Sequence, residues 1–131
     1  MTPHETGALG EAAVAYYLEA LGYEILARGY RIRGGEIDLV ASRGEELCFV
    51  EVKTRKLGAS ESGMEAVDRQ KMARLIRAAY AYCEREGIDE SQWYLRYDIA
   101  EVTTYQGRII DIDHLESAFD ESDFHDNIQK Y

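Results

Sequence analysis

The spacing of hydrophobic residues along the chain predicts two helices. Apolar residues are dense between Thr6 and Gly22, and they recur with helical period from Met64 to about Arg85. Thr6 stands where a side-chain oxygen commonly caps a helix, and Gly22 stands where a glycine commonly ends one. We therefore expect helices over both segments, the second of them ending before Gly87.

Five shorter runs rich in β-branched and aromatic residues predict strands. They cover residues 23–33, 36–42, 46–54 and 93–105, with 108–115 as a partner or edge strand, so that one or two strands follow the second helix. Gly29 predicts a bend in the first strand, and Gly44 predicts a hairpin turn between the second and the third. The order of elements predicts an α/β or α+β fold, with a sheet flanked by helices. We expect one domain over residues 1–110 and a weakly structured acidic tail over residues 111–131.

Composition narrows the class of protein. A chain of 131 residues is the size of one domain, and it contains no apolar run long enough to cross a membrane. The first residues show neither the basic nor the apolar region of a signal peptide, so we expect a cytoplasmic protein. Cys48 and Cys83 are far apart and lack metal-ligand spacing, which favours buried thiols over a disulfide or a zinc site.

Charge is distributed unevenly. The net charge is −10, and residues 111–131 hold seven acidic residues and one basic residue. This argues against a protein that coats nucleic acid by bulk electrostatics, because such proteins gather Lys and Arg to displace counterions. Between residues 53 and 77, however, seven basic residues accompany three acidic ones. That local excess indicates either a phosphate-facing patch or a solvated helix flank.

Three charged residues of the predicted hairpin fall on one face, because successive side chains of a strand alternate. Glu51 and Lys53 share a face of the third strand. A two-residue turn at Gly44 and Glu45 places Asp38 directly across from Glu51, whereas a turn at Arg43 and Gly44 places it diagonally. The same alternation gives the second strand two faces, one with Glu36, Asp38 and Val40 and the other with Ile37, Leu39 and Ala41.

Two carboxylates beside a lysine are costly unless a cation joins them. Mg²⁺ is commonly held by one or two carboxylates, water and substrate phosphate, so Asp38, Glu51 and the Val52 carbonyl are candidate ligands. Lys53 would stabilise developing negative charge or position the nucleophile. The other interpretation is an exposed sheet face with alternating charges.

Glu11 adds a fourth member to this set. It shares a helical stripe with Val14 and Leu18, which should pack on the sheet. Taken alone, it is explained as an edge residue that reaches solvent or charges the first turn of the helix. Together with the hairpin residues, it would bind a second ion or orient a water molecule.

The combination of these residues resembles a known nuclease pattern. Asp38 followed by Glu51-Val52-Lys53 is similar to the PD-(D/E)XK signature of the restriction-endonuclease-like superfamily, and Glu11 resembles the first acidic residue of its Holliday-junction resolvases. More closely, "GEAAVAYYLEALGYEIL", "GEIDLVA", "FVEVKTR" and "RYDIAEV" resemble the YraN-like family of uncharacterised bacterial proteins, from about residue 5 to 105. Gly35-Glu36-Ile37 stands where the signature has proline.

The resemblance implies a restriction-endonuclease-like α/β fold with a mixed central sheet and a magnesium-dependent nuclease site. It marks Glu11, Asp38, Glu51 and Lys53 as the active-site set. We expect nucleic-acid contacts from the basic residues that follow, namely Arg55, Lys56, Lys71 and Arg74. Three histidines without partners at metal or triad spacing are expected at the surface: His4, His114 and His125. Arg96 and Asp98 are expected to form a structural pair.

The leading hypothesis is a metal-dependent endonuclease that hydrolyses phosphodiester bonds in DNA, with branched or recombination DNA as candidate substrates and Mg²⁺ or Mn²⁺ as cofactor. A homodimer would allow two sites to cut opposite strands. The alternative is a catalytically silent module that binds nucleic acid or protein and retains the nuclease-like site. In that case the acidic tail would engage a basic protein partner. A hydrolase of another phosphorylated substrate would use the same metal chemistry.

Overall fold

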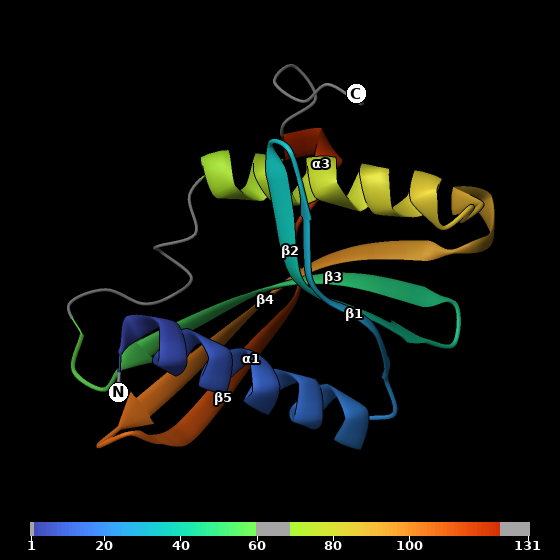
Figure 1. The fold of residues 1–131 in the computed structure, drawn as a ribbon. Coiled ribbons are helices and arrows are strands. Elements are labelled where there is room, and N and C mark those ends of the chain that lie inside the picture. Colours follow the sequence, from blue (N-terminus) through green and yellow to red (C-terminus); the bar gives the residue numbers. More distant parts are fainter. Residues whose placement is uncertain (1, 60–68, 124–131) are drawn as a thin grey trace.

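The strands form one five-stranded sheet with helices on both faces (Figure 1). The computed structural model describes residues 2–59 and 69–123. The helices and strands are α1 (Pro3–Ala20), β1 (Glu24–Ile32), β2 (Gly35–Arg43), β3 (Glu46–Lys56), α3 (Arg69–Arg85), β4 (Tyr94–Tyr105) and β5 (Arg108–Phe119). The strand order is β1-β2-β3-β4-β5; β3 and β4 are parallel and the other pairs are antiparallel. The predicted α/β fold with a mixed, helix-flanked sheet is confirmed.

Each helix covers one face of the sheet with its own buried core. On the α1 face, Val14 and Leu18 pack with Cys48 and Val50 of β3 and their neighbours. On the α3 face, Ile76 and Ala79 pack in the cluster that contains Phe49 of β3. Strand β3 therefore alternates as predicted, with Cys48 and Val50 on one face and Phe49 on the other. Within the described residues, neither helix has the length and apolar character to cross a membrane.

Helix α1 begins earlier than predicted, at Pro3 with Thr2 as its N-cap. The Thr2 hydroxyl accepts a hydrogen bond from the Glu5 N–H, and the Glu5 carboxylate accepts one from the Thr2 N–H. This capping box satisfies donors that the helix end would leave unpaired. The prediction of Thr6 as the cap is therefore wrong, because the Thr6 hydroxyl lies inside the first turn and donates to the Thr2 carbonyl. Gly22 follows the helix with φ 95°, as predicted for its end.

The C-terminal part of the chain is more ordered than its acidity suggested. Strand β5 runs to Phe119 and pairs with β4 along its length, and a short 3-10 helix follows at Glu121–Asp123. The prediction of a weakly structured tail over 111–131 is wrong for residues 111–119, because hydrogen bonding and apolar packing on β4 hold them in the sheet. Residues 124–131 and the predicted start of the second helix at Met64 lie outside the described residues.

Strands β1 and β2 turn away from the rest of the sheet and reach α3 (Figure 1). Gly29 has φ 59°, and the β1–β2 register shifts between Ile25 and Ala27. At the far end, Gly35 packs directly on α3, where a Cβ atom would collide with the α3 backbone. Because of this bend, Ile37 packs in the α3-face cluster and not with Leu39 on the α1 face. The prediction of strict alternation along β2 is therefore wrong at Ile37.

Candidate active site

The β2–β3 turn decides where Asp38 lies. Arg43 pairs with Glu46, so the turn consists of Gly44 and Glu45, and Gly44 adopts φ 60°. The ladder continues to the pair Leu39–Val50 and ends there. One step beyond that pair, Asp38 is opposite Glu51. The two-residue turn is confirmed, and the alternative turn at Arg43 and Gly44 is excluded.

The Asp38 carboxylate lies against the backbone and the carboxyl group of β3. Its Oδ2 accepts a hydrogen bond of 2.8 Å from the Val52 N–H, and the Asp38 and Glu51 carboxyl groups share a hydrogen bond. Burial raises the pKa of both groups, and the Asp38 charge contributes to a Glu51 pKa of about 8. The pair is therefore unfavourable when both groups are ionised, and a cation between them would remove the penalty.

Val52 offers a backbone oxygen beside this pair. The N–H and C=O of one strand residue point to the same side of the strand. Because the Val52 N–H reaches Asp38, the Val52 carbonyl also faces the side where β2 has separated from β3. The Asp38 and Glu51 carboxyl groups and this carbonyl, which the sequence predicted as candidate ligands, therefore lie on the same part of β3.

Two lysines from different elements meet next to the carboxyl pair. Lys53 lies two residues after Glu51 on the same face of β3, and Lys71 comes from the first turns of α3. Hydrogen bonding to Lys71, together with burial and the Lys71 charge, lowers the pKa of Lys53, whereas Glu51 and Asp38 act in the opposite direction. Lys71 also lowers the pKa of Glu51 electrostatically. Lys71 is exposed on the flank of α3, yet it lies close enough to Lys53 and Glu51 to act on both, so it borders the candidate site.

Glu11 reaches the same site from the opposite layer. A pocket of about 400 Å³ is lined by Pro3, Thr6, Gly7, Glu11, Asp38, Val52, Lys53, Thr54, Arg55 and Lys56, and we call it the site pocket. Burial and the Asp38 charge raise the pKa of Glu11. Over residues 2–59 and 69–123, however, no three His, Cys, Asp or Glu side chains are close enough to hold one metal ion together. Glu11 is thus a neighbour of the carboxyl pair and not a third member of a carboxylate cage.

The predicted nucleic-acid contacts separate into two groups. Lys56 is exposed and lines the site pocket together with Arg55. The Arg55 guanidinium is bound to the buried Glu101 carboxylate at 2.6 Å, which fixes its direction. Arg74 lines neither this pocket nor a second one described below, and it lies where α3 packs on Gly35. The structure therefore brings Lys56 and Arg55 to the site pocket and Lys71 to the neighbourhood of Lys53 and Glu51, whereas Arg74 lines neither pocket.

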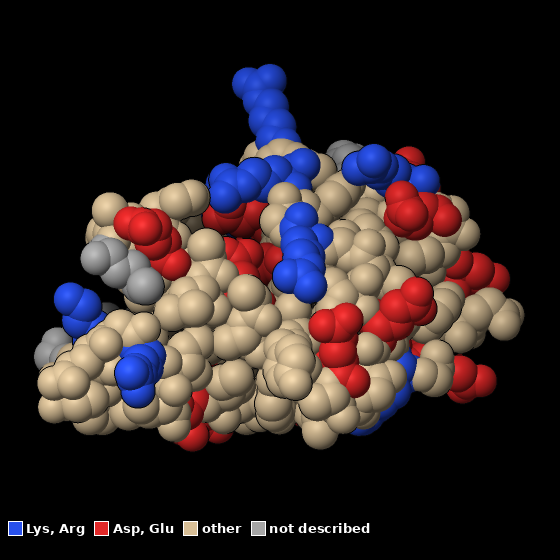
Figure 2. Space-filling view, turned by 60° about the horizontal axis from the view of Figure 1, so that its bottom comes forward, with Lys and Arg blue, Asp and Glu red and all other residues tan. Residues whose placement is uncertain are grey.

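Sequence reasoning overlooked the arginines of β1 and of the turn that follows it. Arg28, Arg31 and Arg33 are all exposed, and Arg31 pairs with Glu36 at 3.2 Å while lowering the pKa of Glu11. Figure 2 shows acidic side chains recessed between basic ones on one face of the molecule. The signal was available, since three arginines occur in six residues just before the GEID motif.

Arg96, Asp98 and His114 form a buried network away from the site pocket. Asp98 is fully buried and accepts hydrogen bonds from Arg96, from the Ser117 N–H at 3.0 Å and from His114 Nε2 at 2.7 Å. The structural Arg96–Asp98 pair is confirmed. The prediction of a surface His114 is wrong, because pairing of β5 with β4 places this ring beside Asp98 and Tyr17. His4 is exposed, as predicted, and His125 lies outside the described residues.

Comparison with known proteins identifies the family. Residues 10–102 match the family described as Uncharacterised protein family UPF0102. A UPF0102 protein of Chloroflexus aurantiacus is 41% identical over 116 residues, which cover 88% of this chain and 92% of the relative. A UPF0102 protein of a Synechococcus species is 48% identical over 103 residues, 78% of each chain. Another from Chlorobium chlorochromatii is 42% identical over 120 residues, with 88% and 91% covered. The chain thus belongs to UPF0102, the YraN-like family that its motifs resemble.

Proposed function

We propose that this protein is a metal-dependent nuclease that hydrolyses phosphodiester bonds in DNA. The observation that carries the proposal is the pair of hydrogen-bonded carboxyl groups, Asp38 and Glu51, with Lys53 and Lys71 beside it. Asp38 and Lys53 line a pocket that opens to solvent, and Glu51 and Lys71 lie next to them. Two partly buried acids side by side, and two neighbouring bases, are unfavourable for folding alone. Strained charge arrangements of this kind are typical of sites that bind a charged ligand.

The residues at the pocket fit one Mg²⁺ ion. Asp38, Glu51 and the Val52 carbonyl would hold it, which leaves coordination positions for water and a substrate phosphate. Hard oxygen donors with few carboxylates are the usual magnesium environment in enzymes that act on phosphates, and Mn²⁺ accepts the same donors. When bound, the ion would supply a Lewis acid for the phosphate and make a neighbouring water more acidic.

The protein's own side chains would do the remaining work. Lys53 lies beside Glu51, so its ammonium would stabilise negative charge that develops on the scissile phosphate. Lys71 would hold a second phosphate oxygen. Glu11 lines the pocket and can orient the attacking water through a hydrogen bond. Lys56, at the rim, would neutralise a flanking phosphate.

The test is cleavage of a panel of duplex, single-stranded, flap and four-way DNA with Mg²⁺ or Mn²⁺. We expect Asp38→Asn and Lys53→Met to reduce cleavage at least about a hundred-fold, because each removes charge stabilisation at the phosphate. Glu45→Gln is the matched control, since it removes a negative charge from the exposed turn of the same hairpin. Cleavage that survives in both site variants would overturn the assignment. Metal binding that depends on Asp38 without any cleavage would instead favour the binding module.

A further inference from the structure

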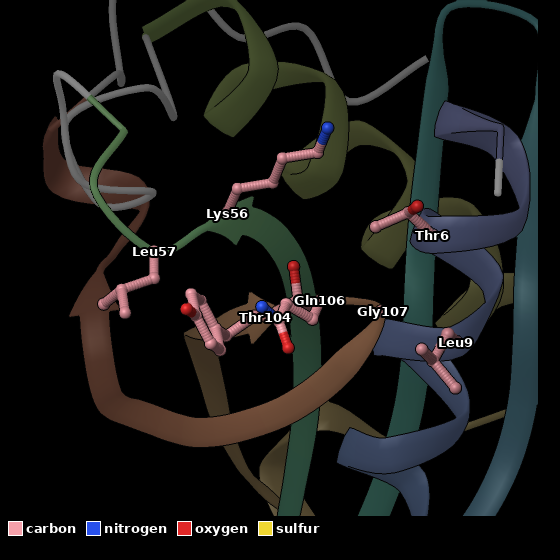
Figure 3. A pocket seen from close by; sticks show the side chains of 8 residues that line it. Thr6, Leu9, Lys56, Leu57, Thr104, Gln106 and Gly107 are labelled. Atoms are coloured by element: carbon pink, nitrogen blue, oxygen red, sulfur yellow. The ribbon is translucent and has the colours of Figure 1, made fainter.

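A second pocket lies next to the site pocket, at the turn between β4 and β5. It encloses about 500 Å³, within the size range of small-molecule and cofactor sites. Its lining residues are Thr6, Leu9, Lys56, Leu57, Thr104, Tyr105, Gln106 and Gly107, and we call it the turn pocket. Figure 3 shows Thr6 and Leu9 of α1 on one side, and Leu57, Thr104 and Gln106 on the other.

The two pockets adjoin. Thr6 and Lys56 line both of them, so the space beside Asp38 leads directly to the β4–β5 turn. Lys56 is the last residue of β3 and carries the positive charge at the boundary. A substrate phosphate held in the site pocket would therefore place the adjoining nucleotide at the turn pocket.

The lining of the turn pocket combines apolar surface with a few polar groups. Leu57 is 56% exposed and Tyr105 is 51% exposed, so both side chains offer apolar surface to a ligand in this pocket. The amide of Gln106 can donate and accept hydrogen bonds at the edge of a base. Proteins bind a single-stranded nucleotide with groups of this kind, namely an aromatic ring, an apolar wall, an amide and a cation.

The walls of the turn pocket are held in place by the backbone. The Leu57 N–H donates to the Thr104 carbonyl at 2.7 Å, and the Thr104 hydroxyl donates to the Arg55 carbonyl at 3.3 Å. Gln106 and Gly107 form a two-residue turn with φ 51° and 76°. Asn or Gly would adopt the positive φ at position 106 with less strain, so the chain keeps a glutamine there at a conformational cost.

From these observations we propose that the turn pocket binds an unpaired nucleotide adjoining the scissile phosphate, with its base stacked on Tyr105. This inference rests on the proposed nuclease function. A base inside a continuous duplex is stacked and paired, so it enters such a pocket only at the cost of unstacking. A nucleotide at a single-stranded branch is already free. The preferred substrate is therefore DNA in which a single strand leaves a duplex beside the cleaved bond.

The experiment compares binding of a duplex with binding of the same duplex carrying a single-stranded flap, with 2-aminopurine as the first unpaired base. Ca²⁺ replaces Mg²⁺ so that binding is measured without hydrolysis. We expect Tyr105→Ala to weaken flap binding about ten-fold, the loss of one base stack, and duplex binding less than about two-fold. Wild type and Tyr105→Phe should quench the 2-aminopurine fluorescence, and Tyr105→Ala should not.

Tyr94→Ala is the matched control, because Tyr94 is 63% exposed at the opposite end of β4. It should leave flap and duplex binding unchanged. Lys56→Ala should weaken the binding of flap and duplex alike, and it should reduce the slope of the salt dependence of binding by about one.

The inference is overturned if Tyr105→Ala weakens the binding of flap and duplex equally, or if it weakens the binding of neither. If wild type cuts DNA but Tyr105→Ala retains its flap preference, the turn pocket proposal fails and the nuclease proposal stands. If flap binding depends on Tyr105 but nothing is cut, the turn pocket proposal stands and the nuclease proposal fails.

Discussion

Glu51→Gln should stabilise the protein when divalent metal is removed. Burial and the Asp38 charge raise the pKa of Glu51 from an ordinary value of 4.5 to about 8. Below pH 4.5 this carboxyl is protonated in both the folded and the unfolded chain and has no effect. As the pH rises from 4.5 to about 8, only the unfolded chain releases the proton, so the free energy of unfolding falls; above pH 8 the loss is complete.

The size of the effect follows from that difference in pKa. The full penalty above pH 8 is at most roughly 5 kcal/mol. Glutamine carries no charge, and its amide can still donate to the Asp38 carboxylate. Water in the open pocket screens part of the repulsion, so we expect a gain of about 2 kcal/mol in the variant at pH 8.5. That gain corresponds to a melting temperature higher by about 6–8 °C.

The assay is urea unfolding at pH 4 and pH 8.5, in EDTA and in excess Mg²⁺. The wild-type protein should gain stability from Mg²⁺ at pH 8.5, because the ion binds the folded state and cancels the repulsion. Glu51→Gln should gain much less. Glu36→Gln is the control, since it removes a negative charge nearby that is paired with Arg31. The reasoning is refuted if Glu51→Gln is no more stable than wild type in EDTA, or if Mg²⁺ stabilises both equally.

Three further predictions concern the fold. Gly10→Ala should destabilise the protein by about 1–2 kcal/mol in thermal unfolding, because its Cβ would collide with a threonine hydroxyl on β3. Gly7 lies on the same helix, but a Cβ atom added there would meet nothing within 4 Å, so Gly7→Ala should stabilise the protein by up to about 1 kcal/mol. Equal effects of the two substitutions would contradict this packing. Asp98→Ala should cost about 3 kcal/mol at pH 7, since it removes the buried partner of a guanidinium. Burial raises the Asp98 pKa, but hydrogen bonds outweigh it and hold the value below 3.8. The stability that Asp98 confers is therefore fully present above pH 3.8, and it should be lost as the pH falls through the lower pKa that Asp98 has in the folded protein. The Asp98→Ala variant should not show this loss of stability. Burial raises the pKa of Cys48 to about 12 and of Cys83 to about 11, so neither thiol should react with a disulfide reagent at pH 8 until urea unfolds the chain.

Local patterns in the sequence predicted the elements and most of the candidate site. Alternation fixed the faces of β3, because a regular strand has a strict two-residue period. The glycines at positions 22 and 44 marked the helix end and the hairpin turn, since both adopt positive φ. These are short-range effects, and the residues that cause them are adjacent in the chain.

Other features depend on contacts between distant segments. Whether Asp38 faced Glu51 directly depended on the position of the two-residue turn, which the two candidate turns left open. Lys71 meets Lys53 because α3 crosses the sheet there, and His114 is buried because β5 pairs with β4.

The sequence by itself therefore determined the elements, the family and the acidic and basic residues of the candidate site. Only the tertiary structure decided that β2 bends away from β3, which brings Glu11 from one layer and Lys71 from the other to the same Asp38–Glu51 pair. The reason is physical: periodicity fixes the face on which a side chain lies, whereas bends and packing between layers fix which faces meet.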